Sequence, residues 1–181
     1  THSDDVGLVC PPRLAQYQVV LVPIYRKDEE RVAVVEAAER LQRALRASGI
    51  RVHLDARDGL KPGAKYYEWE SRGVPFRLEI GPRDLAAEQV MLARRTGGKE
   101  PIPMAGLADR IHVEIDAMQQ ALLGAAMARR DAATIRGATR DQLVEAMNGD
   151  GGFVYGGWCG DAACEADIKE QTKATIRVLP D

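Results

Sequence analysis

The chain has 181 residues, of which 45% are apolar, and its 27 acidic and 25 basic residues nearly cancel. This composition is that of a globular protein with one good core and room for a small second unit. The balanced charge excludes non-specific nucleic-acid binding through a bulk positive field, so a few placed side chains would have to recognise any RNA. No apolar run approaches the roughly 20 residues of a membrane helix, and without a secretory signal we expect a cytoplasmic protein with reduced cysteines.

Strand and helix patterns alternate from residue 18 to about residue 130. Residues 18–24 (QVVLVPI) form a continuous apolar run, which is typical of a strand buried on both faces. Asp28 is predicted to cap the helix that follows, and Gly49 to end it. Further strands are predicted at residues 51–56, 76–80 and 89–95, and further helices from Pro62 to before Gly73 and from about residue 107 to 126. This alternation predicts a single α/β domain.

The two ends of the chain differ from this central region. Residues 1–17, interrupted by Cys-Pro-Pro, are interpreted as a tail or connector that follows a preceding segment. After residue 130 we expect a polar link with a short helix, a glycine turn, an apolar segment, a cysteine loop, a helix at 162–173 and a last strand at 175–179. The predicted organisation is a tail (1–17), an α/β domain (18–130) and a small C-terminal α/β unit (131–181).

No pattern of a self-contained catalytic site is present in the sequence. The three histidines, His2, His53 and His112, lie in a tail, a strand and a helix, and we interpret them as ordinary surface or core residues. The Gly-Gly-Lys at residues 97–99 lacks the glycine spacing of a phosphate loop. No catalytic residue is therefore assigned.

Charged and aromatic residues are interleaved between Arg57 and Lys99, where nine basic and six acidic side chains occur. One interpretation is a solvated sheet edge and helix face. The other is convergence at the ends of strands around a splayed base, because carboxylates accept from the Watson–Crick edge of guanine while Arg and Lys donate to its O6 and N7. The side chains so placed are Glu70, Arg77, Glu79, Arg83, Asp84 and Lys99, of which Arg77 and Glu79 share the polar, outward face of a strand.

Longer motifs resemble one family across essentially the whole chain. THSDDVGLVCPP resembles the segment that closes the catalytic domain of prolyl-tRNA synthetases, with Ser3 where glycine is usual. KPGAKYYEWESRGVPFRLEIGPRDL and RRTGGKE are similar to the anticodon-binding domain of that family. WCGDAACEADIKEQTKATIRVLP is similar to the C-terminal domain of its archaeal and eukaryotic-like branch. The resemblance implies a mixed sheet flanked by helices.

The resemblance also implies roles for individual residues. Glu70, Arg77, Asp84 and Lys99 occupy the positions that contact the two guanines of the proline anticodon, and Arg83 replaces a frequent lysine beside them. It implies a parent enzyme, a homodimer through its catalytic domain, that activates proline with ATP and Mg²⁺ and charges tRNA(Pro). This segment lacks the class II signature motifs, so we expect it to bind tRNA and to catalyse nothing alone. A rival interpretation is a free-standing tRNA-binding accessory module.

Cys159 and Cys164 correspond to half of the four-cysteine zinc site of that family. The second pair would follow RVLP, and Val178 stands where many members have a further cysteine. Because a structural zinc site needs four ligands, we expect metal-free thiols here. A thiol-based redox module built on this pair is a weaker alternative, since four residues separate the cysteines rather than two.

Overall fold

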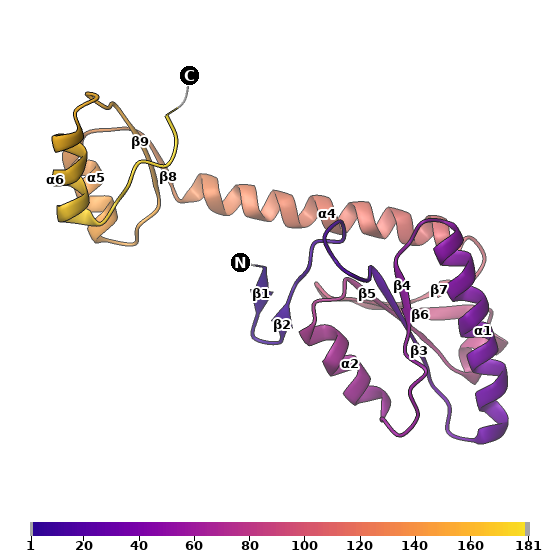
Figure 1. The fold of residues 1–181 in the computed structure, drawn as a ribbon. Helices are drawn as coiled ribbons and strands as arrows, with labels where there is room; N and C mark the ends of the chain where they lie inside the picture. The colour runs from indigo at the N-terminus through magenta and orange to yellow at the C-terminus, as the bar shows by residue number, and fades with distance from the viewer. Residues whose placement is uncertain (1, 180–181) are drawn as a thin grey trace. The chain divides into compact units, whose positions relative to one another are not determined.

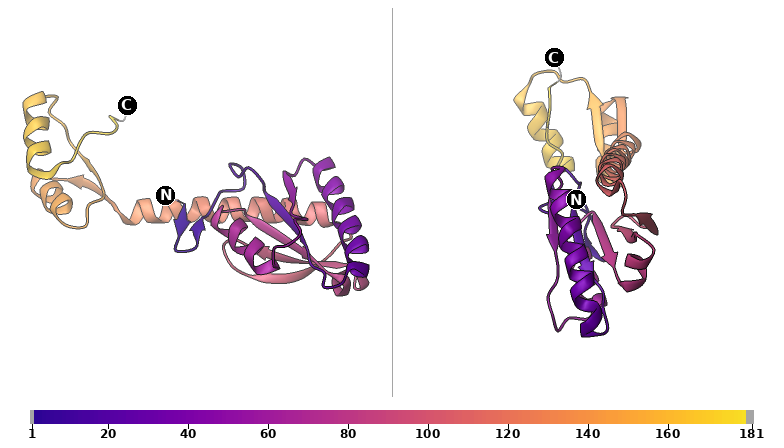
Figure 2. Two further views of the ribbon diagram at one scale, coloured as in Figure 1. Left: turned by 60° about the horizontal axis from the view of Figure 1, so that its bottom comes forward. Right: turned by 90° about the vertical axis from the view of Figure 1, so that its right-hand side faces the viewer.

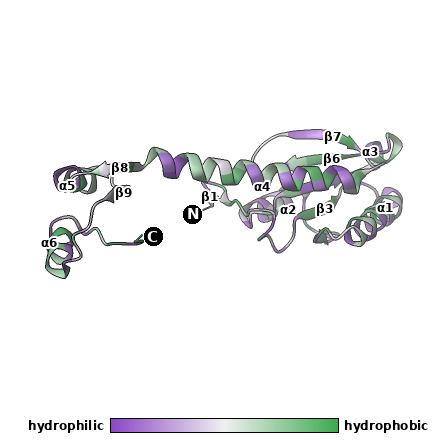
Figure 3. Ribbon diagram, turned by 90° about the horizontal axis from the view of Figure 1, so that it is seen from above, coloured by the Kyte–Doolittle hydropathy of each residue, from purple (hydrophilic) through white to green (hydrophobic). Residues whose placement is uncertain are grey.

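The computed structural model describes residues 2–179 and divides into two compact units, one extending through Leu122 and the other beginning at Leu123 (Figure 1). The long helix α4 (Leu107–Ala132) crosses this division. Figure 3 shows hydrophilic and hydrophobic segments alternating along α4, as expected of a helix that buries one face. Within the described residues, no helix is long and apolar enough to cross a membrane.

A five-stranded mixed sheet forms the centre of the first unit, in the order β4-β3-β5-β6-β7. β3 pairs in parallel with both β4 and β5, whereas β5, β6 and β7 are antiparallel neighbours. The strands are β3 (Val19–Pro23), β4 (Val52–Leu54), β5 (Phe76–Ile80), β6 (Gln89–Arg94) and β7 (Lys99–Pro103). The expected α/β fold with a mixed sheet flanked by helices is therefore confirmed.

The two faces of this sheet have different covers (Figure 2). α1 (Asp28–Ala47) and α4 pack on one face and enclose the main core. That core contains the completely buried side chains of Val19, Leu21, Val34, Phe76, Leu78, Ile80, Val90, Leu92 and Ile111. On the other face α2 (Pro62–Ser71) contributes Trp69 to a smaller cluster with Val20 and Val22. Successive strand residues point to opposite faces, so the alternation within β5 separates these two environments.

The ends of the helices agree with local chemistry, with one correction. Asp28 does not cap α1: Lys27 occupies the N-cap position without a side-chain cap bond, and Asp28 lies in the first turn. An acidic first turn still favours the helix through its dipole. Pro62 begins α2 and Gly73 follows its end at φ +73°, the left-handed conformation that glycine adopts without strain.

The first seventeen residues contain a short hairpin, β1 (Ser3–Asp4) and β2 (Gly7–Leu8). The hairpin packs closely on the end of α2, because a Cβ built on Gly7 would lie 2.6 Å from the Cα of Ser71. A Cβ on Gly73 would likewise lie 2.7 Å from the carbonyl oxygen of Leu8. Glycine at both positions therefore permits the close approach of hairpin and helix.

The second unit contains a two-stranded parallel sheet and two helices after the end of α4. β8 (Thr134–Ala138) pairs with β9 (Phe153–Gly156), while α5 (Arg140–Asn148) and α6 (Ala162–Thr172) follow one strand each. α5 has a capping box in which the Thr139 side chain accepts from Gln142 N and the Gln142 side chain accepts from Thr139 N. The strand predicted at 175–179 is wrong, since these residues have no regular secondary structure.

Candidate nucleic-acid interface

One cross-strand row of the α2-covered face carries two of the candidate cations. Register pairs Val20 with Arg77, Arg77 with Ala93, and Ala93 with Lys99. Arg77 on β5 and Lys99 on β7 therefore lie two strands apart on the same face, with only the small side chain of Ala93 between them.

Arg77 is held from three directions rather than projecting into solvent. Its Nη1 donates to Glu70 Oε1 at 2.6 Å, its Nε donates to Glu79 Oε1 at 3.1 Å, and its guanidinium carbon lies 4.0 Å from the centroid of the Tyr66 ring. The Arg77 side chain is only 11% exposed. The strand alternates as predicted, and Arg77 lies on the expected face. The expectation that this face is exposed to solvent is wrong, because α2 covers it.

Glu79 connects the two cations. Its Oε2 accepts from Lys99 Nζ at 2.7 Å, while its Oε1 accepts from Arg77. Burial first, and then the nearby carboxylate of Glu79, raise the pKa of Tyr66 above its ordinary value, and Asp84 adds to this effect. The sequence placed Glu79 on the same strand face as Arg77 but assigned it no anticodon contact, and Tyr66 was given no role. The signals were the strand alternation, which puts Glu79 on the face of Arg77, and the spacing of Tyr66 and Glu70 by four residues on one helix.

Arg83 and Asp84 lie in the short helix α3 (Pro82–Ala86), which begins directly after β5. Asp84 Oδ2 accepts from the backbone N–H of Gly81 at 2.9 Å and so stabilises the first turn of this helix. Arg83 is exposed. Glu70 therefore pairs directly with Arg77, and Lys99 is joined to Arg77 through Glu79. Arg83 and Asp84 lie beyond the end of the same strand.

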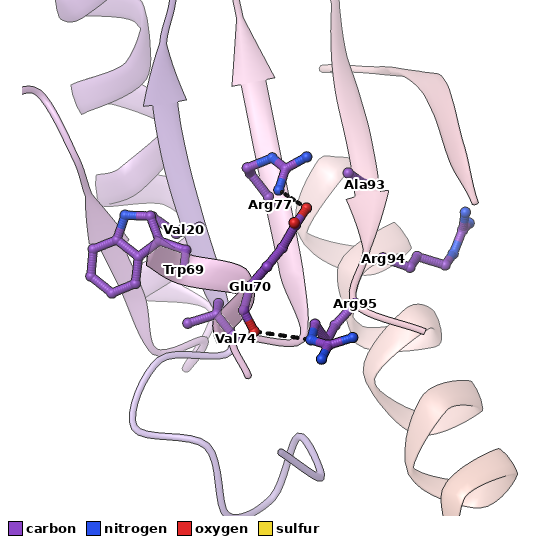
Figure 4. Close-up of a pocket in the computed structure, with 8 residues that line it drawn as sticks. All are labelled: Val20, Trp69, Glu70, Val74, Arg77, Ala93, Arg94 and Arg95. Atoms are coloured by element: carbon purple, nitrogen blue, oxygen red, sulfur yellow. Dashed lines mark hydrogen bonds and ion pairs between the residues drawn. The ribbon is translucent and has the colours of Figure 1, made fainter. Parts of the chain in front are cut away.

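A shallow pocket lies between the end of α2 and strands β5 and β6, as Figure 4 shows. Arg94 turns away from it toward α4, where its Nε donates to Glu114 Oε2 at 2.7 Å. The residues around the pocket are Val20, Trp69, Glu70, Val74, Arg77, Ala93, Arg94 and Arg95. The charged groups of Glu70 and Arg77 therefore stand above a small apolar floor.

Arg95 fixes the backbone beside this pocket. Its Nε donates to the carbonyl oxygens of Glu70 at 3.0 Å and Leu8 at 2.9 Å, and its Nη1 donates to Asp4 Oδ2 at 2.7 Å. The hydrogen bond from Arg95 lowers the pKa of Asp4 far below its usual range. With its side chain 5% exposed, Arg95 ties the N-terminal hairpin and the end of α2 to the sheet.

A second buried network attaches the middle of α2. Trp69 Nε1 donates to Asp55 Oδ2 at 2.8 Å, and Arg57 Nε donates to Asp55 Oδ1 at 2.8 Å. Burial alone would raise the pKa of Asp55, but the hydrogen bonds from Arg57 and Trp69 outweigh it and hold the pKa below its ordinary value. The His53 ring packs at a tilt against Trp69, with ring centroids 4.8 Å apart, so this histidine belongs to the packing of α2.

The cysteine loop of the second unit places Cys164 in the first turn of α6 and Cys159 just before that helix. The neighbouring thiol of Cys159 is the main reason that the pKa of Cys164 is raised above its ordinary value. Within residues 2–179, no group of three or more His, Cys, Asp or Glu side chains could hold a metal ion. The residues present do not fit a structural zinc ion, which takes four ligands.

The interface as a whole offers mixed hydrogen-bonding chemistry. Arginine and lysine supply donors only, and ionised carboxylates supply acceptors only. Guanine presents acceptors at O6 and N7 and donors at N1 and N2, so a cluster with both types of group suits this base.

Known proteins resemble this chain along nearly its whole length. Residues 18–133 match a family model described as "Anticodon binding domain", and residues 140–181 match one described as "Prolyl-tRNA synthetase, C-terminal". Similar proteins named proline–tRNA ligase include those of Chloroflexus aggregans (49% identical over 184 residues), Roseiflexus sp. strain RS-1 (45% over 184) and Cenarchaeum symbiosum (44% over 181). Each alignment covers 99% of this chain and 38% of the relative, so the chain spans well under half the length of these curated relatives.

Proposed function

This chain belongs to the anticodon-binding domain family, and we propose that it recognises the anticodon of proline tRNA as the C-terminal part of a proline–tRNA ligase. The whole enzyme would activate proline with ATP and Mg²⁺ and transfer it to the tRNA. Proteins named proline–tRNA ligase align with 99% of this chain, which favours this proposal over a free-standing accessory module.

The observation that carries the proposal is the cluster of Arg77, Lys99, Glu70 and Glu79. It sets hydrogen-bond donors beside acceptors on a half-covered sheet face, next to a shallow pocket. Arg77 would donate to O6 and N7 of an anticodon guanine, and Glu70 would accept from its Watson–Crick edge. Lys99 and Asp84 would contact the second guanine, with Arg83 adding positive charge near the phosphates.

Binding to a stem–loop RNA tests this proposal. The RNA carries the proline anticodon with its two guanines, and the comparison RNA has adenines at those positions. Arg77→Lys keeps the charge but removes the planar fork, so affinity for the guanine RNA should fall about ten- to a hundredfold, corresponding to about 1–3 kcal/mol. Affinity for the adenine RNA should hardly change.

A matched control lies on the opposite side of the sheet. Arg43 on α1 is 69% exposed and pairs weakly with Glu39, so Arg43→Lys should leave binding to both RNAs unchanged. Titrations at several salt concentrations separate base recognition from phosphate contact. If Arg77→Lys weakens both RNAs equally and reduces the salt dependence, Arg77 contacts the backbone and the proposed base recognition is wrong.

A further inference from the structure

We infer that Glu79 is the fixed positioning residue of this interface, and that Glu70 is an exchangeable partner which occupies Arg77 until a base replaces it. The inference rests on the proposed function, because it describes how the same site changes from its free to its bound state. It assigns different roles to two carboxylates that contact one guanidinium.

The first observation is the burial of Glu79. Its side chain is 4% exposed and accepts from cations on two different strands, Arg77 on β5 and Lys99 on β7. Separating Glu79 from both would leave a buried charge without a partner, which is strongly unfavourable. Glu79 therefore stays in place and sets the position of both cations whether or not RNA is bound.

The second observation is the accessibility of Glu70. Its side chain is 39% exposed, and its carboxylate contacts a terminal nitrogen of Arg77, Nη1, as Figure 4 shows. A carboxylate leaving this position enters water, so its displacement costs little. Arg95 Nε donates to the carbonyl oxygen of Glu70 at 3.0 Å, so the backbone of Glu70 is anchored while its side chain is free to change rotamer.

The third observation is the stacking of Tyr66 on Arg77. The ring centroid lies 4.0 Å from the guanidinium carbon, so the plane of the guanidinium is fixed by a face contact as well as by the Nε–Glu79 bond. When Glu70 leaves, Nη1 becomes free beside Nη2 in this fixed plane. The pair then forms the two-donor fork that matches O6 and N7 of guanine.

Discrimination follows from the exchange. A base with suitable acceptors replaces the hydrogen bond that Glu70 gives up, and the released carboxylate is then placed to accept from the same base. A base that offers an amino group in place of O6 cannot replace that bond, so Glu70 remains on Arg77. The ion pair of the free protein thus contributes to specificity as a competitor.

The first experiment is NMR of the ¹⁵N-arginine-labelled chain without RNA, which tests the roles proposed for Glu79 and Glu70. The Nε–Hε signal of Arg77, assigned by its loss in Arg77→Lys, should show protection from solvent exchange. Glu79→Gln should reduce this protection, because an amide oxygen accepts a weaker hydrogen bond than a carboxylate, whereas Glu70→Gln should leave it and alter the Nη signals instead. Glu68→Gln is the matched control, because Glu68 also lies on α2 but pairs with Arg57 and Arg72, and it should change neither signal. If the Nε signal of Glu79→Gln exchanges as slowly as in the wild type, the anchoring role is wrong.

The guanine stem–loop RNA then tests the exchange. On titration the Nη signals of Arg77 should shift while Nε–Hε stays protected, and the adenine RNA should shift neither. Loss of the Nε protection on binding, or unchanged Nη signals in a saturated complex, would overturn the exchange. If no RNA binds, the proposed function and the exchange both fail, while the RNA-free spectra still decide the role of Glu79.

Affinity measurements provide a readout that a merely structural role would not produce. Glu79→Gln should weaken binding to the guanine RNA about tenfold, with a much smaller effect in the Arg77→Lys background, because both changes remove the same positioned fork. Equal effects in the two backgrounds would show that Glu79 acts through general stability rather than through Arg77.

Discussion

The two faces of the central sheet bury different kinds of side chain. The face under α1 and α4 encloses a mainly apolar core, in which Phe76, Leu78 and Ile80 are completely inaccessible. Its buried charged side chain is Glu114 of α4, which accepts from Arg94. The face under α2 buries ionisable groups as well, including Asp55, Lys65 and Glu79. Strand β5 contributes to both faces at alternate residues. One strand thus contributes apolar side chains to the core on one side and a prearranged cluster of paired charges on the other.

The largest expected effect is on the apolar face. Phe76→Ala removes a fully buried ring and leaves a cavity in the main core, so the free energy of unfolding should fall by about 3–5 kcal/mol. Urea denaturation followed by circular dichroism measures this change. At temperatures where the variant is folded, its preference for guanine over adenine RNA should be retained. A change in that preference would show that the two faces are not independent.

A smaller effect, dependent on pH, is expected where α2 attaches to the sheet. Asp55→Asn weakens the charged hydrogen bonds to Arg57 and Trp69, and should lower the free energy of unfolding by about 2 kcal/mol at pH 7. Because the pKa of Asp55 is lowered in the folded state, its contribution is present above the unfolded pKa of about 3.9 and is lost below it.

The difference between wild type and Asp55→Asn should therefore shrink as the pH falls from about 5 toward 2. Unfolding curves measured across this range for both proteins provide the test. A difference that stays constant down to pH 2 would mean that Asp55 stabilises the fold through packing rather than through its charge.

A third substitution separates stability from recognition on the α2 side. Lys99 is 46% exposed in its ion pair with Glu79, so Lys99→Gln should change the free energy of unfolding by less than about 1 kcal/mol. Affinity for the guanine RNA should nevertheless fall by up to about tenfold. If stability and affinity both stay unchanged, Lys99 is a solvated surface charge and takes no part in recognition.

The smallest effect is expected on the outer surface of the helix that covers the apolar face. Val32 on α1 is 60% exposed, so Val32→Ala should alter the free energy of unfolding by less than about 0.5 kcal/mol. RNA binding should not change. A measurable loss of binding would place a contact surface on α1, outside the interface described above.

The sequence by itself determined those elements in which apolar and polar residues follow a clear pattern. The apolar run of β3 and the alternation of β5 indicated strands, because side chains on a pleated strand must match the polarity of the face they meet. Long motifs also identified Glu70, Arg77 and Lys99, and the structure brings these three together. Local spacing places Glu70 near Arg77, since helix α2 and strand β5 are close in the chain, whereas Lys99 is brought in by the pairing of β5, β6 and β7.

Strand pairing decided what local pattern could not. β7 contains two prolines, Pro101 and Pro103, which argue against a strand, yet it forms because it lies at the sheet edge and pairs only with β6. Residues 175–179 alternate like a strand but have none of the inter-strand hydrogen bonds that define one. A strand depends on its neighbour, and that neighbour is distant in sequence.

Only the tertiary structure decided which charged residues became buried and paired. Polarity placed Arg77 and Glu79 on a solvated face, but α2 covers that face and turns Glu79 into the shared partner of Arg77 and Lys99. Arg95, unremarkable in the sequence, holds a hairpin some 90 residues earlier in the chain. Burial and ion pairing depend on how whole helices and strands pack, and the free energy of a charged side chain depends on its burial and its partners. A sequence pattern therefore identifies the charged residues, while the assembled fold determines what they do.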